Sequence, residues 1–212
     1  CPEENGPDLD YSASSISIDL GFRDILVAGQ KSGVVYGLDP DNGEILWSNV
    51  LSGGGTQGGV HFGMASEGET VYVPLHDMEQ TNDGKIYEDL KPGVHSVDAK
   101  TGELLWSKIN PNNCGDIKFC DPGVSAALTA IPGAVIAGHQ DGKIRIYDKE
   151  DGEILWSFDA LREFESVSGV PASGGGFSGP GSAIRNGYMA MNSGYGIYYH
   201  MPGNSLLLFS VD

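Results

Sequence analysis

Basic side chains are scarce in this sequence of 212 residues, where 12 Lys and Arg face 29 Asp and Glu and the formal net charge is −17. Affinity for nucleic-acid phosphates comes from clustered Lys and Arg, so this imbalance argues against a nucleic-acid partner. The acidity is typical of a well-solvated surface, and a specific cationic partner is the alternative interpretation.

Long apolar runs are also missing. No stretch approaches the ~20 apolar residues that a membrane-spanning helix needs, and we expect no membrane span. No secretion signal is recognisable, so we expect a mature chain, a fragment or one piece of a larger protein. The sequence has no G-x-S-x-G nucleophile motif, and its Gly-rich run over 169–181 lacks the Lys and Ser/Thr that end a phosphate-binding loop. We interpret that run as a flexible crossing between elements.

Only three cysteines occur. Cys114 and Cys120 flank a short loop rich in Pro, Asn, Gly and Asp, a spacing that suits a small disulfide ring. Such a ring forms in an oxidising compartment, which predicts a periplasmic or extracellular location. A metal-binding pair is the alternative, without a second Cys or His pair nearby. Cys1 then either joins a cysteine of another chain or carries the lipid of a mature lipoprotein.

One ten-residue phrase occurs three times, and it is the most informative feature of the chain. The copies read DPDNGEILWS from Asp39, DAKTGELLWS from Asp98 and DKEDGEILWS from Asp148. In each copy Gly follows Asp by four residues, and Trp follows Gly by four. Repetition of such a phrase along the chain is typical of a repeated supersecondary unit rather than of a helical array.

The letters of the phrase predict its local structure. Apolar and β-branched residues flank every copy, which indicates strand, tight turn and strand. The Gly supplies the positive φ of the turn, the Asp accepts hydrogen bonds from turn N–H groups, and the Trp packs on the neighbouring unit. One hairpin cannot bury its own apolar face, so several must pack side by side, and radial packing of such sheets gives an all-β propeller.

Further strands are expected upstream of each hairpin and in a fourth unit. They cover residues 24–30, 70–76, 134–140, 187–194 and 205–212. We therefore expect residues 1–212 to form a single partial β-propeller domain of about four blades. The expected blades cover roughly 10–50, 56–110, 124–160 and 168–212.

The repeated phrase resembles the tryptophan-docking repeats of the quinoprotein dehydrogenases, which are eight-bladed propellers that bind pyrroloquinoline quinone (PQQ). Such repeats also occur in non-enzymatic propellers, including the outer-membrane assembly lipoprotein. Segments outside the repeats are similar to the polyvinyl-alcohol-dehydrogenase-like branch, which shares GPDxDxxAS, GGGTQGGVHFGMA, SAALTAIPG, SGYG and PGNxLLxFSVD. The resemblance covers nearly the whole chain and implies the C-terminal half of such an enzyme.

Half of a propeller would expose two sheet edges and an unburied face, which is a poor free-standing state. We therefore expect the ring to be completed by an N-terminal half-propeller on a separate chain, with Cys1 in a loop near the cut. A second copy of this chain is the alternative. The resemblance also implies that the calcium-binding Glu and Asn, and the vicinal cysteines that stack on the quinone, lie in the N-terminal half.

The resemblance assigns roles to three residues. DLDY is similar to the family's WDY-type segment, which makes Asp10 the catalytic carboxylate and a calcium ligand, with Asp8 the neighbouring candidate. Leu9 stands where the family usually has Trp. Lys31 falls where the family carries the Lys or Arg that contacts the quinone, and His61 lies in the glycine-dense segment that touches the cofactor. The alternatives are a turn-capping carboxylate, a solvated lysine and a packed histidine.

The other histidines carry weaker signals. His76, His95 and His139 lie at strand ends or turns without metal-binding spacing. His200 lies in YGIYYHMPGN, whose aromatic residues could line a substrate entrance or pack in the interior.

The implied activity is alcohol oxidation. A carboxylate takes the hydroxyl proton, calcium and a cation polarise the quinone, and the quinone accepts two electrons. The substrates would be secondary hydroxyls, including those of a polymer such as polyvinyl alcohol. With no C-x-x-C-H haem site in the sequence, a separate cytochrome c would take the electrons. The alternative is a non-catalytic propeller for binding, scaffolding or outer-membrane assembly.

Overall fold

The computed structural model describes residues 6–78, 88–196 and 198–211, and all regular structure in these ranges is β-strand. The all-β expectation is confirmed. No helix in the described ranges is long and apolar enough to cross a membrane. The strands are β1 (Ile16–Asp19), β2 (Asp24–Gly29), β3 (Val34–Leu38), β4 (Ile45–Val50), β5 (Ala65–Glu67), β6 (Thr70–Leu75), β7 (Gly93–Asp98), β8 (Leu104–Ile109), β9 (Thr129–Ile131), β10 (Ala134–Gly138), β11 (Lys143–Asp148), β12 (Ile154–Asp159), β13 (Glu163–Glu165), β14 (Pro171–Ser173), β15 (Ala183–Arg185), β16 (Tyr188–Ser193) and β17 (Ser205–Ser210).

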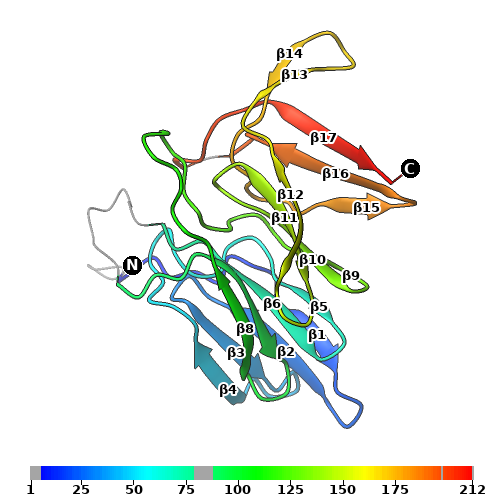
Figure 1. The fold of residues 1–212 in the computed structure, drawn as a ribbon. Coiled ribbons are helices and arrows are strands. Elements are labelled where there is room, and N and C mark those ends of the chain that lie inside the picture. The colour runs from blue at the N-terminus through cyan, green and yellow to red at the C-terminus, as the bar shows by residue number, and fades with distance from the viewer. Residues whose placement is uncertain (1–5, 79–87, 197, 212) are drawn as a thin grey trace.

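Neighbouring strands pair antiparallel, in chain order, into blade-like sheets (Figure 1). Three sheets have four strands each, namely β1–β4, β5–β8 and β9–β12, and a fourth sheet has the three strands β15–β17. The sheets follow one another from the first, in blue, to the last, in red, as in an open fan (Figure 1). This arrangement is that of part of a β-propeller.

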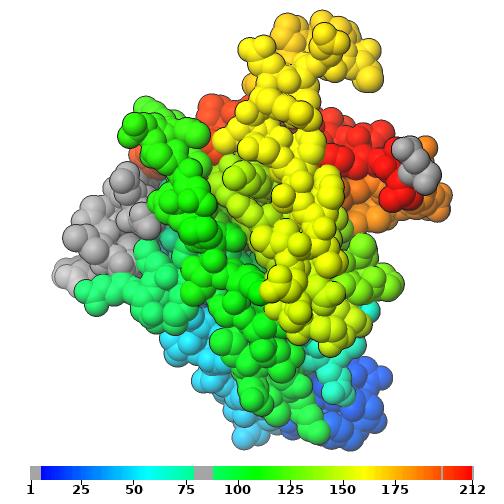
Figure 2. Space-filling model, in the orientation of Figure 1, coloured from blue at the N-terminus to red at the C-terminus, as the bar shows by residue number. Residues whose placement is uncertain are grey.

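A separate two-stranded hairpin, β13–β14, stands apart from the blade-like sheets. In the space-filling view it projects from the body of the molecule as a yellow knob (Figure 2). The run over 169–181, which we interpreted from sequence as a flexible crossing, therefore contributes strand β14, with Glu165 paired to Pro171. The correction arises because the pairing partner lies upstream of the run, where the Gly-rich composition gave no signal.

The repeated phrase folds as its letters predict. In every copy the Gly has a positive φ, and the Asp carboxylate accepts a hydrogen bond from an N–H group within the turn. The bonds run from Asp41 to Asp39 (2.9 Å), from Thr101 to Asp98 (2.8 Å) and from Glu150 to Asp148 (2.8 Å). The values of φ are 76° at Gly43, 74° at Gly102 and 71° at Gly152. These contacts fix the strand–turn–strand geometry locally.

Each of the first two tryptophans docks on the next sheet. Nε1 of Trp47 donates to the carbonyl oxygen of Ala99, and Nε1 of Trp106 donates to that of Lys149, both over 2.9 Å. The acceptor in each case is the residue after the Asp of the following repeat. Trp156 differs, because its indole is 38% exposed and rests edge-on against Phe209, with 5.6 Å between the ring centroids.

Apolar residues bury themselves between consecutive sheets rather than in one central core. Val27, Val35 and Val71 belong to a cluster between the first and second sheets. Tyr72 and Tyr147 lie in a second cluster, between the second and third sheets. A third cluster, which contains Ile136, Phe177 and Met191, joins the third sheet to the fourth. Inter-sheet burial of this kind is what makes a single blade unstable on its own.

The predicted disulfide is confirmed. Cys114 and Cys120 are bonded, with 5.6 Å between their Cα atoms, in the loop that leads from β8 to β9. Cys1, for which we expected a partner in another chain or a lipid, lies outside the described residues.

Candidate functional site

Two aspartates and a lysine meet beside the first sheet. The ammonium Nζ of Lys31 lies 2.9 Å from Oδ2 of Asp10 and 3.4 Å from Oδ2 of Asp8. The lysine side chain is only 13% exposed, whereas those of the aspartates are 60% and 59% exposed. The backbone joins the same segments, because the N–H of Lys31 donates to the carbonyl of Asp10 over 3.0 Å. The sequence singled out all three residues, and the structure brings them together.

The glycine-dense segment holds the backbone of Lys31 in place. The N–H of Gly55 donates to the carbonyl of Lys31 over 2.9 Å, and the N–H of Val60 donates to that of Gln30 over 3.1 Å. A Cβ atom at Gly54 or Gly59 would overlap with the carbonyl of Lys31, and both glycines have positive φ. These two glycines are therefore required by close approach to the protein's own backbone, whereas we expected close approach to a ligand.

The lysine controls the charge on this side of the site. Its hydrogen bond and its charge hold the pKa of Asp10 below the ordinary value, with a smaller contribution from Asp8. Asp10 is therefore ionised at neutral pH, as a proton acceptor must be. Two carboxylates around one ammonium leave this side of the site with net negative charge.

His61 lies deeper than the charged residues. It is 5% exposed, and its Nδ1 lies 3.2 Å from Oγ of Ser125. Burial, followed by the charge of Lys31 and the nearby His200, lowers the pKa of His61 to about 3. The imidazole is therefore neutral at physiological pH, and it is a packed histidine that also faces the pocket described next.

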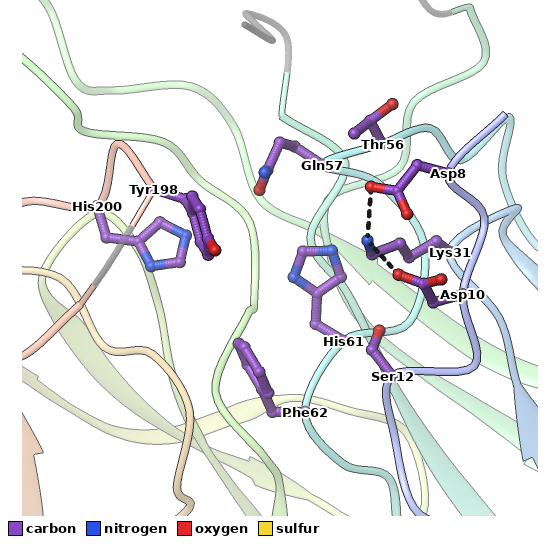
Figure 3. Close-up of a pocket in the computed structure, with 10 residues that line it drawn as sticks. All are labelled: Asp8, Asp10, Ser12, Lys31, Thr56, Gln57, His61, Phe62, Tyr198 and His200. Carbon is purple, nitrogen blue, oxygen red and sulfur yellow. Dashed lines mark hydrogen bonds and ion pairs between the residues drawn. The ribbon is translucent and has the colours of Figure 1, made fainter. Parts of the chain in front are cut away.

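These residues line one pocket with a volume of about 390 Å³. Figure 3 shows Asp8, Asp10 and Lys31 on one side, His200 and Tyr198 on the other, and His61 between them. The lining residues are Asp8, Asp10, Ser12, Lys31, Thr56, Gln57, His61, Phe62, Tyr198 and His200. Cofactor and substrate sites commonly occupy pockets of about 300–1,000 Å³ with few convergent polar groups.

Sequence reasoning missed Gln57 and Phe62, and it left open whether the loop of Tyr198 and His200 lines an entrance or packs in the interior. Gln57 and Phe62 flank His61 within the glycine-dense segment but carried no signal of their own. Tyr198 and His200 come from the loop between β16 and β17, and Tyr198 has a positive φ of 54°, which is rare for a bulky residue. Of the two alternatives that the aromatic composition of this loop left open, the structure shows Tyr198 and His200 lining the pocket.

The remaining histidines divide into two groups. His95 and His139 are bonded at both ring nitrogens, His95 to Lys91 and Ser107 and His139 to Asn110 and Tyr147. His76 does not line the pocket but is in ring contact with His61 and His200, which do. Among the described residues, no group of three or more His, Cys, Asp or Glu side chains is arranged to hold a metal ion.

Comparison with known proteins gives a family and close relatives. A family model described as "Outer membrane protein assembly factor BamB" matches residues 21–177. A polyvinyl alcohol dehydrogenase of Pseudomonas sp is 40% identical over 229 residues, which cover 100% of this chain and 34% of that protein. A polyvinyl alcohol dehydrogenase of Sphingopyxis sp. (strain 113P3) is 35% identical over 230 residues, with the same coverage of 100% and 34%. The chain thus spans about a third of the length of these curated relatives.

Solved structures agree on the fold. The quinohemoprotein alcohol dehydrogenase ADHIIG from Pseudomonas putida HK5 superposes with a TM-score of 0.63 at 16% identity. The superposition covers 96% of this chain and 34% of that one. At this identity the similarity concerns the fold alone.

Proposed function

The chain belongs to the quinoprotein propeller family, in the branch of the polyvinyl alcohol dehydrogenases, and from this premise we propose that it forms part of a PQQ-dependent dehydrogenase that oxidises secondary hydroxyl groups. The proposed substrates include the hydroxyls of a polymer such as polyvinyl alcohol. The observation that carries the proposal is the ion pair of Asp10 and Lys31, which are 2.9 Å apart in a pocket that His61 also lines.

The pocket is lined in part by residues from outside the repeat region, which supports a catalytic function over a scaffolding one. The family model matches residues 21–177, the part that contains the repeats. Asp8, Asp10 and His200 lie outside that range, and yet they converge with Lys31 and His61 on one pocket. A propeller that served only as a scaffold would need the repeats but no such convergence.

The volume of the pocket and the cation that lines it fit a planar quinone. The volume of about 390 Å³ has room for a tricyclic quinone, and among the described lining residues Lys31 is the one cation. When bound, PQQ would supply a two-electron acceptor. Lys31 would donate a hydrogen bond to a carbonyl oxygen of the quinone and stabilise negative charge there. His61 would offer its neutral imidazole as a further contact to the cofactor.

Asp10 is proposed as the general base. Its ionised carboxylate would accept the hydroxyl proton of the alcohol, while the carbinol hydrogen leaves with the electron pair. The ion pair with Lys31 keeps the proton affinity of Asp10 low, so a lysine engaged by the quinone would leave Asp10 a stronger base. Phe62 and Tyr198 would offer apolar surface to the bound substrate or cofactor.

Calcium does not fit the described residues alone. A calcium ion takes 6–8 oxygen ligands, and the carboxylates of Asp8 and Asp10 both face the ammonium of Lys31. Asp10 as a calcium ligand therefore stays a prediction that needs further oxygen ligands, and we derive no step through the metal.

Partners complete the proposal. The fourth sheet has three strands where each of the other three blade-like sheets has four, and the indole of Trp156 is exposed. Both features support completion of the ring by an N-terminal half-propeller or, alternatively, by a second copy. A cytochrome c is the proposed electron acceptor. The Cys114–Cys120 disulfide supports a periplasmic or extracellular location.

The alternative is a non-catalytic propeller for binding, scaffolding or outer-membrane assembly, which the description of the matching family model favours. Dye-linked oxidation of secondary alcohols by the native protein, with added PQQ and calcium ions, separates the two. Quinone uptake with turnover is the expected result. An intact assembly that takes up no quinone would leave the assembly function as the better account.

A further inference from the structure

Three buried histidines stand in ring contact beside the pocket. The ring centroids of His61 and His76 are 4.5 Å apart, and those of His76 and His200 are 5.3 Å apart. The three come from different loops, since His61 precedes β5, His76 follows β6 and His200 precedes β17. We call these residues the histidine row.

Most ring nitrogens of the row lack hydrogen-bond partners within the described part of the chain, the exception being Nδ1 of His61, which lies 3.2 Å from Oγ of Ser125. Neither nitrogen of His76 and neither nitrogen of His200 has a hydrogen-bond partner there, although His76 is fully buried and His200 is 7% exposed. An imidazole deprived of water without a replacement partner is costly, and buried polar groups in folded proteins are nearly always paired. Four unpaired nitrogens on adjacent rings therefore indicate a place that a polar group fills.

The two other buried histidines of the chain do have hydrogen-bond partners at their ring nitrogens. His139 is as deeply buried as His76, but Asn110 and Tyr147 occupy its two nitrogens at 2.7 and 3.0 Å. His95 is bonded in the same manner to Lys91 and Ser107. Among the described histidines, the unpaired nitrogens are thus confined to those that line or adjoin the pocket.

His200 and the charged residues face the pocket from different sides, and His76 packs against His61 and His200 without lining the pocket. Asp8, Asp10 and Lys31 lie at one side and His200 at the other (Figure 3). A ligand that satisfied both sides would need polar groups at two positions. A simple alcohol has only one.

The charge state of the row selects the kind of group. Burial lowers the pKa of His200 to about 4 and that of His76 well below the ordinary value. A neutral imidazole has one donor and one acceptor nitrogen, which matches a hydroxyl group and gives no charge attraction to a carboxylate or phosphate.

We propose that the histidine row is a subsite for a second, uncharged hydroxyl group of the substrate, with His200 as the residue that determines specificity for diols and larger polyols. The proposal rests on the dehydrogenase function in one respect only, which is that the first hydroxyl lies at Asp10. Binding of the second hydroxyl needs no turnover.

The test compares two alcohols that differ in one hydroxyl, pentane-2,4-diol and the mono-alcohol pentan-2-ol, on the native protein loaded with PQQ and calcium ions. In the wild type, the diol should have the lower KM by about tenfold, the value of one well-formed hydrogen bond. His200→Phe keeps an aromatic ring but removes the nitrogens. In this variant the KM for the diol should rise about tenfold, while the KM for the mono-alcohol and both kcat values stay within about twofold. Tyr195→Phe is the matched control, because Tyr195 belongs to the same loop but does not line the pocket.

A second readout is independent of activity. The ¹⁵N resonances of the imidazoles should shift when the diol is added to the protein without an electron acceptor, and the shifts should be lost in His200→Phe. Shifts without any alcohol oxidation would support the subsite and refute the dehydrogenase. Oxidation of both alcohols with an unchanged KM ratio in His200→Phe would refute the subsite and leave the dehydrogenase intact. Shifts caused by equimolar Zn²⁺ but not by the diol would also overturn the proposal, since the row would then be a metal site.

Discussion

Lys31 places its ammonium group 2.9 Å from the carboxylate of Asp10, and its own backbone N–H donates to the carbonyl of that residue. Side chain and main chain thus tie the turn after β2 to the segment that precedes β1. The pair is fixed by contacts of the glycine-dense loop rather than by its own weak ion-pair energy, since the aspartate is largely exposed.

Removal of the lysine charge should change the proton affinity of Asp10. In Lys31→Met the pKa of Asp10 should rise toward its ordinary value, because the two largest causes that lower it come from Lys31. Carboxyl-detected NMR measures this pKa. The affinity for PQQ should fall at least about tenfold in the same variant, which is the scale of one charge-assisted hydrogen bond.

Lys108→Met serves as the control for that variant. Lys108 also forms an ion pair, 3.2 Å from Glu153, but it lies away from the pocket. Equal losses of PQQ affinity in both variants would show that net charge, rather than a contact of Lys31, holds the quinone.

Substitution by leucine should change the free energy of unfolding very differently at two fully buried histidines. His139→Leu removes the partner of the Tyr147 hydroxyl and one of the two partners of the Asn110 side-chain amide, and it should lower the free energy of unfolding by about 3 kcal/mol. His76→Leu removes two unpaired nitrogens, so the ligand-free protein should lose less than about 1 kcal/mol or gain stability. Urea unfolding measures both. A loss at His76 as large as that at His139 would mean that its nitrogens are bonded in solution.

Acid should destabilise the protein over a defined range. The folded pKa values of His61 and His200, about 3 and about 4, lie below the unfolded value of 6.5. Between pH 6.5 and about 4 the unfolded chain therefore binds more protons, and stability falls as pH falls, by on the order of 1 kcal/mol per pH unit for each of these histidines. Urea unfolding at pH 7, 6 and 5 gives this slope. In His200→Phe the slope should decrease by about one proton, and an unchanged slope would contradict the burial of His200.

The docking of Trp47 on Gly102 can be measured with a matched pair of glycines. Gly43 and Gly102 occupy the same position of the repeat with φ of 76° and 74°, but a Cβ would meet open space at Gly43 and would overlap with the Trp47 ring at Gly102. Gly43→Ala should cost about 1–2 kcal/mol for the left-handed backbone alone. Gly102→Ala should cost about 2 kcal/mol more, by overpacking. Equal costs in thermal unfolding would show that the indole is free to move away.

The sequence predicted those parts of the fold that local chemistry determines. The strand expected over 24–30 is β2 (Asp24–Gly29), and the turns follow because Asp, Gly and Trp act within or next to one hairpin. The Cys114–Cys120 ring follows from a separation of six residues. The short strands β1, β5, β9 and β15 were not anticipated, because three or four residues carry too little periodicity.

The site was predictable only in part. Asp10 and Lys31 were singled out through the family resemblance, and their 2.9 Å contact follows from folding. The histidine row could not be found, since His61 and His200 come from distant loops. Whether a buried ring nitrogen has a partner depends on every neighbour in space, which sequence spacing does not record.

The most direct test of the proposed function is the effect of Asp10→Asn on PQQ-dependent oxidation of a secondary alcohol by the native protein. The account predicts that kcat falls by at least about 100-fold, the contribution of a general base, while PQQ affinity changes less than about threefold. Asp8→Asn, which alters the more distant carboxylate at 3.4 Å from Lys31, should retain most of the activity. Full turnover in Asp10→Asn would contradict the assignment of Asp10 as the base.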